Sequence, residues 1–176
     1  MKASRFVSGL LMSAALSVFV CNNSIAGVQK KIFNGKATIE IPEGFEKVSN
    51  NAVGKKNGKK ITENTEIWVL PKEEGKVMLL LQLSGNKVSE DQLPQVAEAI
   101  KKDGKAKVSS VSDINVNGQK MSRLTMVSDS PRGKLISLIQ LSSMDGVLLK
   151  ANFLVTEDLK DQYSKLADQT LSTLKY

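Results

Sequence analysis

The sequence predicts an α+β protein in which helices cover an antiparallel sheet. Three hairpin signals, each a turn segment between runs of strand-forming residues, imply that consecutive strands pair with one another. Two further segments carry apolar residues at three- and four-residue steps, the spacing of a helix with one buried stripe. Such a stripe has to be buried against the sheet, so the helices should cover its faces.

Asn-Gly dipeptides mark the first two hairpins, because this pair tolerates the positive φ angles of a tight turn. In the arm that follows the second dipeptide, Arg123 shares one face with Met121 and Thr125, since successive side chains of a strand point to opposite faces. The predicted arms are residues 31–33 and 36–41 around Asn34-Gly35, and residues 114–116 and 120–127 around Asn117-Gly118.

The remaining strands are predicted from runs of apolar and β-branched residues bounded by turn signals. Residues 77–83 are apolar on both faces and predict a central strand with cover on both sides. Residues 49–65 are polar and basic and predict a loop. The other predicted strands are residues 65–70, joined to 77–83 by the turn 71–75, and residues 134–141 and 147–155 around the turn 142–146.

Each predicted helix has a capping residue and an apolar stripe. Ser89 is the candidate N-cap of the middle helix, and Pro94 places its first regular turn near Leu93. Thr156 is the candidate N-cap of the last helix, which is expected to run from Glu157 nearly to Tyr176. The predicted stripes are Leu93, Val96, Ala97 and Ile100 in the middle helix, and Leu159, Tyr163, Leu166, Thr170 and Leu174 in the last.

The first 26 residues have the order of a secretory signal peptide. A basic start is followed by the 15 uncharged residues 6–20, and Ser24-Ile25-Ala26 places small residues where a signal peptidase cleaves. As a helix the apolar run would span about 22 Å, less than the ~30 Å of a bilayer core, which favours removal over anchoring. We therefore expect cleavage between Ala26 and Gly27, leaving residues 27–176 as a single domain in the periplasm or secreted.

Cys21 offers an alternative processing route. A lone cysteine after a hydrophobic stretch is typical of bacterial lipoproteins, in which it is acylated and anchors the protein to the membrane. Lipoprotein signals usually carry a small residue before that cysteine, whereas Val20 is branched and larger. The sequence favours cleavage after Ala26 and leaves acylation at Cys21 as the alternative.

Composition excludes several classes of chemistry for residues 27–176. That part has no histidine and no cysteine, which removes the common nucleophile systems and the usual zinc and copper ligands, so no cofactor is expected. Its net charge is +5 once Lys2 and Arg5 are removed, which favours solubility without implying a nucleic-acid partner. The least favoured interpretation is a hydrolase that uses a Ser–Lys dyad or a pair of carboxylates.

Four groups are candidate catalytic, metal or ligand sites, and each has a simpler structural interpretation. Adjacent carboxylates at a turn need not converge, and acidic residues at a helix start complement its dipole. A serine in a strand-to-strand turn lacks a nucleophile-elbow pattern, and a tryptophan within a strand usually packs in the core. The groups are Glu73-Glu74, the set Glu157, Asp158 and Asp161, the segment 128–132, and Trp68.

The strongest feature outside the predicted core is a basic cluster formed by Lys55, Lys56, Lys59 and Lys60. These four lysines could contact lipid phosphates, an anionic polysaccharide or an acidic protein, including peripheral contact with an anionic membrane. The cluster carries no interleaved aromatic residue or arginine, so base stacking and nucleic-acid binding are not indicated. A solvated loop is the simpler interpretation.

Several patches together resemble the DcrB family, periplasmic lipoproteins of enteric bacteria whose relatives share a PsbP-like fold. The resemblance rests on residues 35–42, the Ile67-Trp68-Val69 strand, the lone middle helix, residues 116–121 and the amphipathic last helix. It implies an α/β/α sandwich around an antiparallel sheet, no established enzymatic activity, and links to envelope maintenance and phage entry. The residue before Cys21 departs from the family's lipoprotein signal.

The export signal, together with the absence of histidine and cysteine from residues 27–176, predicts a non-enzymatic envelope protein. It would bind another protein or an envelope component through one sheet face or the basic cluster. A periplasmic immunity or chaperone-type partner of a secreted effector is the alternative, because related folds in secretion systems bind effector helices.

Overall fold

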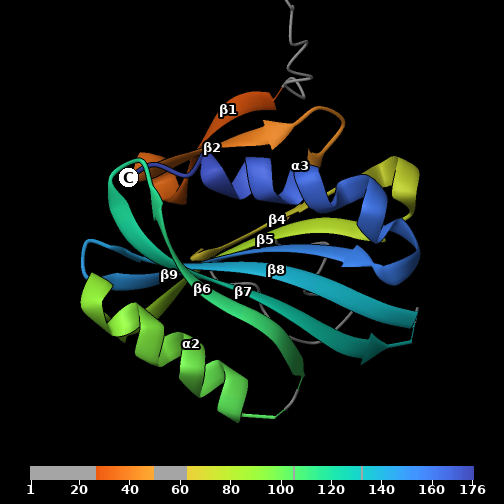
Figure 1. The fold of residues 1–176 in the computed structure, drawn as a ribbon. Coiled ribbons are helices and arrows are strands. Elements are labelled where there is room, and N and C mark those ends of the chain that lie inside the picture. Colours follow the sequence, from red (N-terminus) through yellow and green to blue (C-terminus); the bar gives the residue numbers. More distant parts are fainter. Residues whose placement is uncertain (1–26, 50–62, 105, 132) are drawn as a thin grey trace, which may run out of the picture.

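A seven-stranded antiparallel sheet forms the centre of the fold (Figure 1). The computed structural model describes residues 27–49, 63–104, 106–131 and 133–176. The strand order is β3-β4-β5-β9-β8-β7-β6, so the last strand lies between β5 and β8. The strands are β3 (Glu46–Lys47), β4 (Thr65–Val69), β5 (Val77–Lys87), β6 (Lys107–Val116), β7 (Gln119–Ser130), β8 (Gly133–Met144) and β9 (Val147–Thr156).

A separate two-stranded sheet is formed by β1 (Gly27–Ile32) and β2 (Ala37–Pro42). The predicted first hairpin is confirmed, but its turn takes four residues rather than two, since Ile32 pairs with Ala37. Asn34 and Gly35 adopt φ angles of 59° and 85°, the left-handed region that the Asn-Gly dipeptide tolerates. In Figure 1 this hairpin lies across α3 on the side away from the large sheet.

A buried carboxylate joins this hairpin to the large sheet. Glu66 in β4 is 7% exposed, and its Oε1 accepts a hydrogen bond of 3.1 Å from the backbone N–H of Phe33. Its Oε2 lies 2.9 Å from Nζ of Lys47, which also sits 5.8 Å from the ring centroid of Trp68. Trp68 is buried in the core, as predicted.

The two predicted helices are α2 (Leu93–Lys102) and α3 (Lys160–Ser172). A 3₁₀ turn precedes each one, and the side chain of Gln92 closes a capping box by accepting a hydrogen bond of 2.9 Å from the Ser89 N–H. The last helix is shorter than predicted at both ends. Its α-helical part ends at Ser172 because Lys175 then pairs in extended conformation with Thr38 of β2.

The helices pack on opposite faces of the large sheet, as two residues on opposite faces of one strand show. On β7, Met121 belongs to the core cluster that includes the buried residues of α3, whereas Leu124 packs with Leu93 and Ala97 of α2. Figure 1 shows α3 above the sheet and α2 below it. α2 packs against β6, β7 and β8, at one end of the sheet.

The two faces of β5 are covered to different degrees. β5 is an interior strand between β4 and β9, as predicted. Val77, Leu79 and Leu81 are fully buried on the α3 face, but Met78 and Leu80 on the opposite face are only half-buried. The physical reason is that α2 packs at the far end of that face, over β6 to β8.

The other two predicted hairpins are confirmed, and one of them has a shorter turn than predicted. Asn117-Gly118 forms a two-residue turn between β6 and β7. The predicted turn 142–146 reduces to Asp145-Gly146, because β8 pairs with β9 as far as Met144 and Val147. Within the described ranges, no helix has both the length and the apolar composition to cross a membrane.

Candidate functional site: a groove along the edge strand β6

Two adjoining hollows of about 400 and 530 Å³ lie between α2 and β6. They share Pro94 and Asp113, so together they form one groove, which we call the edge groove. Its α2 side is lined by Glu90, Asp91, Leu93, Pro94, Glu98 and Lys101, and its β6 side by residues 108–115; Lys120, Met121 and Ser122 of β7 complete it.

The edge groove follows β6 along its length. Residues 108–115 all line it, through side chains or backbone. Among the described strands, β6 is the last of the sheet and pairs with β7 alone.

The elements on either side of the groove are firmly packed. Leu93 and Ala97 fix α2 to the sheet, since both are buried against Leu124, Ile139 and Leu141. β6 is held by its regular pairing with β7 from Ser110 to Val116, with one irregularity between Val108 and Ser110. Packing on the α2 side and strand pairing on the β6 side thus position the two walls of the groove.

Charge is distributed unevenly along the groove. At the end near the β6–β7 turn, Asp91 lies 3.3 Å from Lys120 Nζ, and Asp113 Oδ1 accepts a hydrogen bond of 2.8 Å from Ser122 Oγ. At the other end, Lys101 pairs with Glu98 at 3.6 Å, and Lys107 is exposed. Because exposed ion pairs are weak, these groups remain available to a charged ligand.

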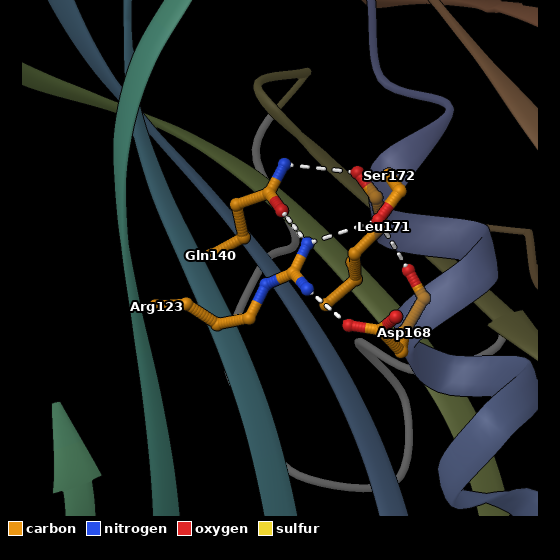
Figure 2. Close-up of polar contacts among 5 residues, drawn as sticks. All are labelled: Arg123, Gln140, Asp168, Leu171 and Ser172. Carbon is orange, nitrogen blue, oxygen red and sulfur yellow. Dashed lines mark hydrogen bonds and ion pairs between the residues drawn. The ribbon is translucent and has the colours of Figure 1, made fainter. Parts of the chain in front are cut away.

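A second polar constellation joins β7 and β8 to α3, as Figure 2 shows. Arg123, whose side chain is 13% exposed, pairs with Asp168 and donates a hydrogen bond to Oε1 of the buried Gln140. Gln140 Nε2 in turn donates a hydrogen bond of 2.9 Å to the Leu171 carbonyl. Burial lowers the pKa of the Arg123 guanidinium from its ordinary value, and the Asp168 carboxylate opposes that shift.

This constellation, the helix latch, has a structural role. The two terminal nitrogens of Arg123 and the side-chain amide of Gln140 make contacts that join the sheet to the last turns of α3. The β6–β7 turn extends the same attachment, because Asn117 Nδ2 donates a hydrogen bond of 2.9 Å to the Leu174 carbonyl and Gln119 Nε2 one of 3.4 Å to that of Tyr176. The latch thereby fixes the hairpin whose outer strand forms the edge groove.

The candidate catalytic and metal groups are dispersed. Glu73 Oε1 accepts a hydrogen bond of 2.6 Å from the Tyr163 hydroxyl, and Asp158 pairs with Lys76 at 2.9 Å. Ser130 Oγ donates a hydrogen bond of 2.7 Å to the Gly133 carbonyl, as expected of a turn residue. No group of three or more His, Cys, Asp or Glu residues in the described segments is arranged to hold a metal ion.

The Tyr163–Glu73 contact predicts a loss of stability at high pH. Burial, and after it the hydrogen bond and charge of Glu73, raise the pKa of Tyr163 to about 12, whereas a tyrosine in the unfolded chain titrates near ~10. The unfolded chain therefore loses this proton first, so the stabilisation is complete below about pH 10 and is lost as the pH rises toward about 12. The measurement compares unfolding free energies of wild type and Tyr163→Phe across that window. A constant difference between the two proteins would contradict the assignment.

Other predicted site residues fall outside the described residues. These are Cys21, Ala26, and the basic cluster of Lys55, Lys56, Lys59 and Lys60. Gly27 is described and begins β1, where it pairs with Pro42. The edge groove was not predicted, because the sequence does not show which strand lies at the sheet edge.

No protein-family model matches the chain, and no curated protein matches it. Solved structures do, and they define the class of fold: the chain is PsbP-like. It is similar to cyanobacterial PsbP (CyanoP) from Synechocystis, with 13% identity, a TM-score of 0.57, and coverage of 93% of this chain and 98% of that one. The Ran-binding protein Mog1p of Saccharomyces cerevisiae is 9% identical, with a TM-score of 0.53, and the match covers 86% of this chain and 96% of that one.

A protein of Bacteroides thetaiotaomicron is also similar in structure, with 9% identity and a TM-score of 0.54. That match covers 85% of this chain and 48% of the other. At identities this low the three likenesses show the fold. They confirm the PsbP-like part of the expectation drawn from the DcrB resemblance.

Proposed function

We propose that this chain is an exported, non-enzymatic binding protein of the bacterial envelope, and that it holds its partner in the edge groove. The observation that carries the proposal is the groove itself, an open hollow along eight consecutive residues of a sheet edge. The groove walls carry hydroxyl, carboxylate and lysine groups, which suit recognition of a polar chain.

The distribution of reactive groups supports binding over catalysis. Tyr163 with Glu73 and Arg123 with Asp168 are each placed in a contact between secondary-structure elements. The carboxylates Asp91 and Asp113 do line the edge groove, but each has a local partner: Asp91 pairs with Lys120, and Asp113 accepts a hydrogen bond from Ser122. No histidine or cysteine lies beside them, because residues 27–176 contain neither.

The biological setting proposed is that of DcrB-like proteins, with roles in envelope maintenance and phage entry. The PsbP-like fold is consistent with it, and Mog1p, which shares the fold, is named for binding another protein, Ran. Cleavage after Ala26 would leave β1 intact from its first residue, so the proposed export is compatible with the fold. The basic cluster around Lys55 would add contact with anionic membrane or an acidic partner.

The test isolates the tagged full-length protein from its host envelope fraction under mild conditions. N-terminal sequencing should begin at Gly27, because Ala26 completes the signal pattern. One partner should co-purify in near-equal amount. An acylated Cys21 as first residue would overturn the cleavage site, and a cytoplasmic protein without a stoichiometric partner would overturn the proposed function.

A further inference from the structure

The outer edge of β6 carries backbone groups that no strand in the described part of the chain pairs with. Asn117 and Gly118 have φ angles of 52° and 85°, so they form a two-residue turn whose closing pair, Val116 and Gln119, is hydrogen-bonded. Hydrogen-bonded and open pairs alternate along an antiparallel ladder. Counting back from Val116, the N–H and C=O groups of Asn115, Asp113 and Val111 therefore point away from β7.

The residues that carry these outward groups also line the edge groove. Asn115 and Asp113 are exposed, Val111 is half-buried, and all three line the hollows described above. The continuous lining from residue 108 to residue 115 corresponds to about 27 Å of extended chain at about 3.4 Å per residue. That length suits a strand of about eight residues.

The geometry favours a partner chain over a second copy of this protein. A self-pairing that used all three outward residues would place Asp113 directly opposite Asp113 of the other copy. Like charges directly opposite each other destabilise a strand pair. The same carboxylate would instead attract a cationic side chain.

Charge also fixes the direction of the incoming strand. Glu90, Asp91 and Asp113, with Lys120, line the end of the groove near the β6–β7 turn, so that end carries an excess of negative charge. At the other end the lining holds Lys101 paired with Glu98, and Lys107 lies just beyond the lining at the start of β6. All strand pairs in this sheet are antiparallel, the more stable arrangement for an added strand. An antiparallel strand would begin beside Asp113 and end beside Lys107.

We propose that β6 accepts an extended segment of a partner protein as an eighth, antiparallel strand, with lysine or arginine toward the segment's amino end and carboxylates toward its carboxyl end. Backbone hydrogen bonds to Val111, Asp113 and Asn115 provide affinity, and the charges at the two ends set direction. This inference rests on the proposed function and names the chemistry of its partner.

The probe is a synthetic nonapeptide with a threonine- and valine-rich centre, two lysines at its amino end, two glutamates at its carboxyl end, and blocked termini. The matched control peptide exchanges the lysines and glutamates. Hydrogen exchange followed by NMR should show new protection of the Val111, Asp113 and Asn115 amides with the probe. Ser112 and Ile114, whose amides already face β7, should change little. The control peptide should bind at least about threefold more weakly.

Substitutions separate the backbone contribution from the charge. Asn115→Pro removes one outward N–H without changing the charge, and it leaves the β6–β7 ladder intact. It should therefore lower the affinity for the probe about tenfold. Asp113→Asn keeps the N–H and removes the charge, and it should reduce the difference between the two peptides. Far-ultraviolet circular dichroism checks that each variant folds.

Protection of the outward amides by the probe, together with loss of affinity in a folded Asn115→Pro, would support strand addition. No protection in the wild-type protein would overturn it, whatever the variants do. Pairing of β6 between two copies, seen as a dimer with the same amides protected without peptide, would also overturn it. If the envelope partner still co-purifies while the probe fails, the proposed function survives and only strand addition falls.

Discussion

Replacing Phe153 with alanine is expected to cost about 3–5 kcal/mol of unfolding free energy. Phe153 is 1% exposed in the middle of β9, opposite Leu79 of β5 and Leu138 of β8. Its ring also lies 5.9 Å from that of Phe45. The truncation removes contacts to both neighbouring strands and leaves a cavity in the core beneath α3. Domains of this size are stable by only about 5–15 kcal/mol, so the loss is a large share of the total.

Chemical denaturation of wild type and variant measures this loss. Phe153→Leu is the matched control, because it keeps most of the apolar volume and should cost less than about 1.5 kcal/mol. Equal effects from the alanine and leucine variants, or a loss below about 1 kcal/mol for alanine, would show that β9 does not lie at the centre of the sheet.

Replacing Gln140 with leucine is expected to cost about 1–3 kcal/mol, although leucine is apolar and similar in size. Gln140 is fully buried and joins Arg123 to the Leu171 carbonyl in the helix latch. Leucine would leave the half-buried guanidinium without the acceptor that Gln140 provides. The Leu171 carbonyl would keep only its contacts to the backbone N–H groups of Thr173 and Leu174. Leaving a buried polar group without its partner costs more unfolding free energy than the net contribution of the hydrogen bond itself.

Thermal or chemical unfolding tests the latch, with Ser172→Ala as the control. Ser172 is exposed, and its hydroxyl accepts from Arg123 at 3.3 Å, so its loss should cost less than about 0.5 kcal/mol. A double-mutant cycle of Gln140→Leu with Arg123→Met should reveal coupling between them. Additive effects would mean that the latch is not a connected network.

Local signals in the sequence predicted the elements well. Asn34-Gly35 and Asn117-Gly118 mark turns in which both residues take positive φ, as the chemistry of the dipeptide requires. Pro94 correctly moved the start of α2 to Leu93, because proline is tolerated in the first helical turn. The end of α3 was missed, because the pairing of Lys175 with Thr38 is a long-range contact that no local pattern reveals.

The candidate site was less accessible to prediction for the same reason. Alternation along residues 120–127 placed Arg123 on the face of Met121, but nothing in that pattern shows that this face meets α3. The edge groove depends on the insertion of β9 beside β5, which leaves β6 at the end of the sheet. Strand order of this kind is decided by packing between distant segments and not by hydrophobic period.

Photo-crosslinking in living cells tests the central claim, that the edge groove is the binding site, most directly. A photoreactive amino acid is placed at Ser109 or Asn115, both exposed in the groove lining, and at Lys72, exposed in the turn before β5 that lies outside that lining. We predict one defined protein adduct from each groove position and none from Lys72. Adducts that form from Lys72 while both groove positions remain silent would contradict the claim.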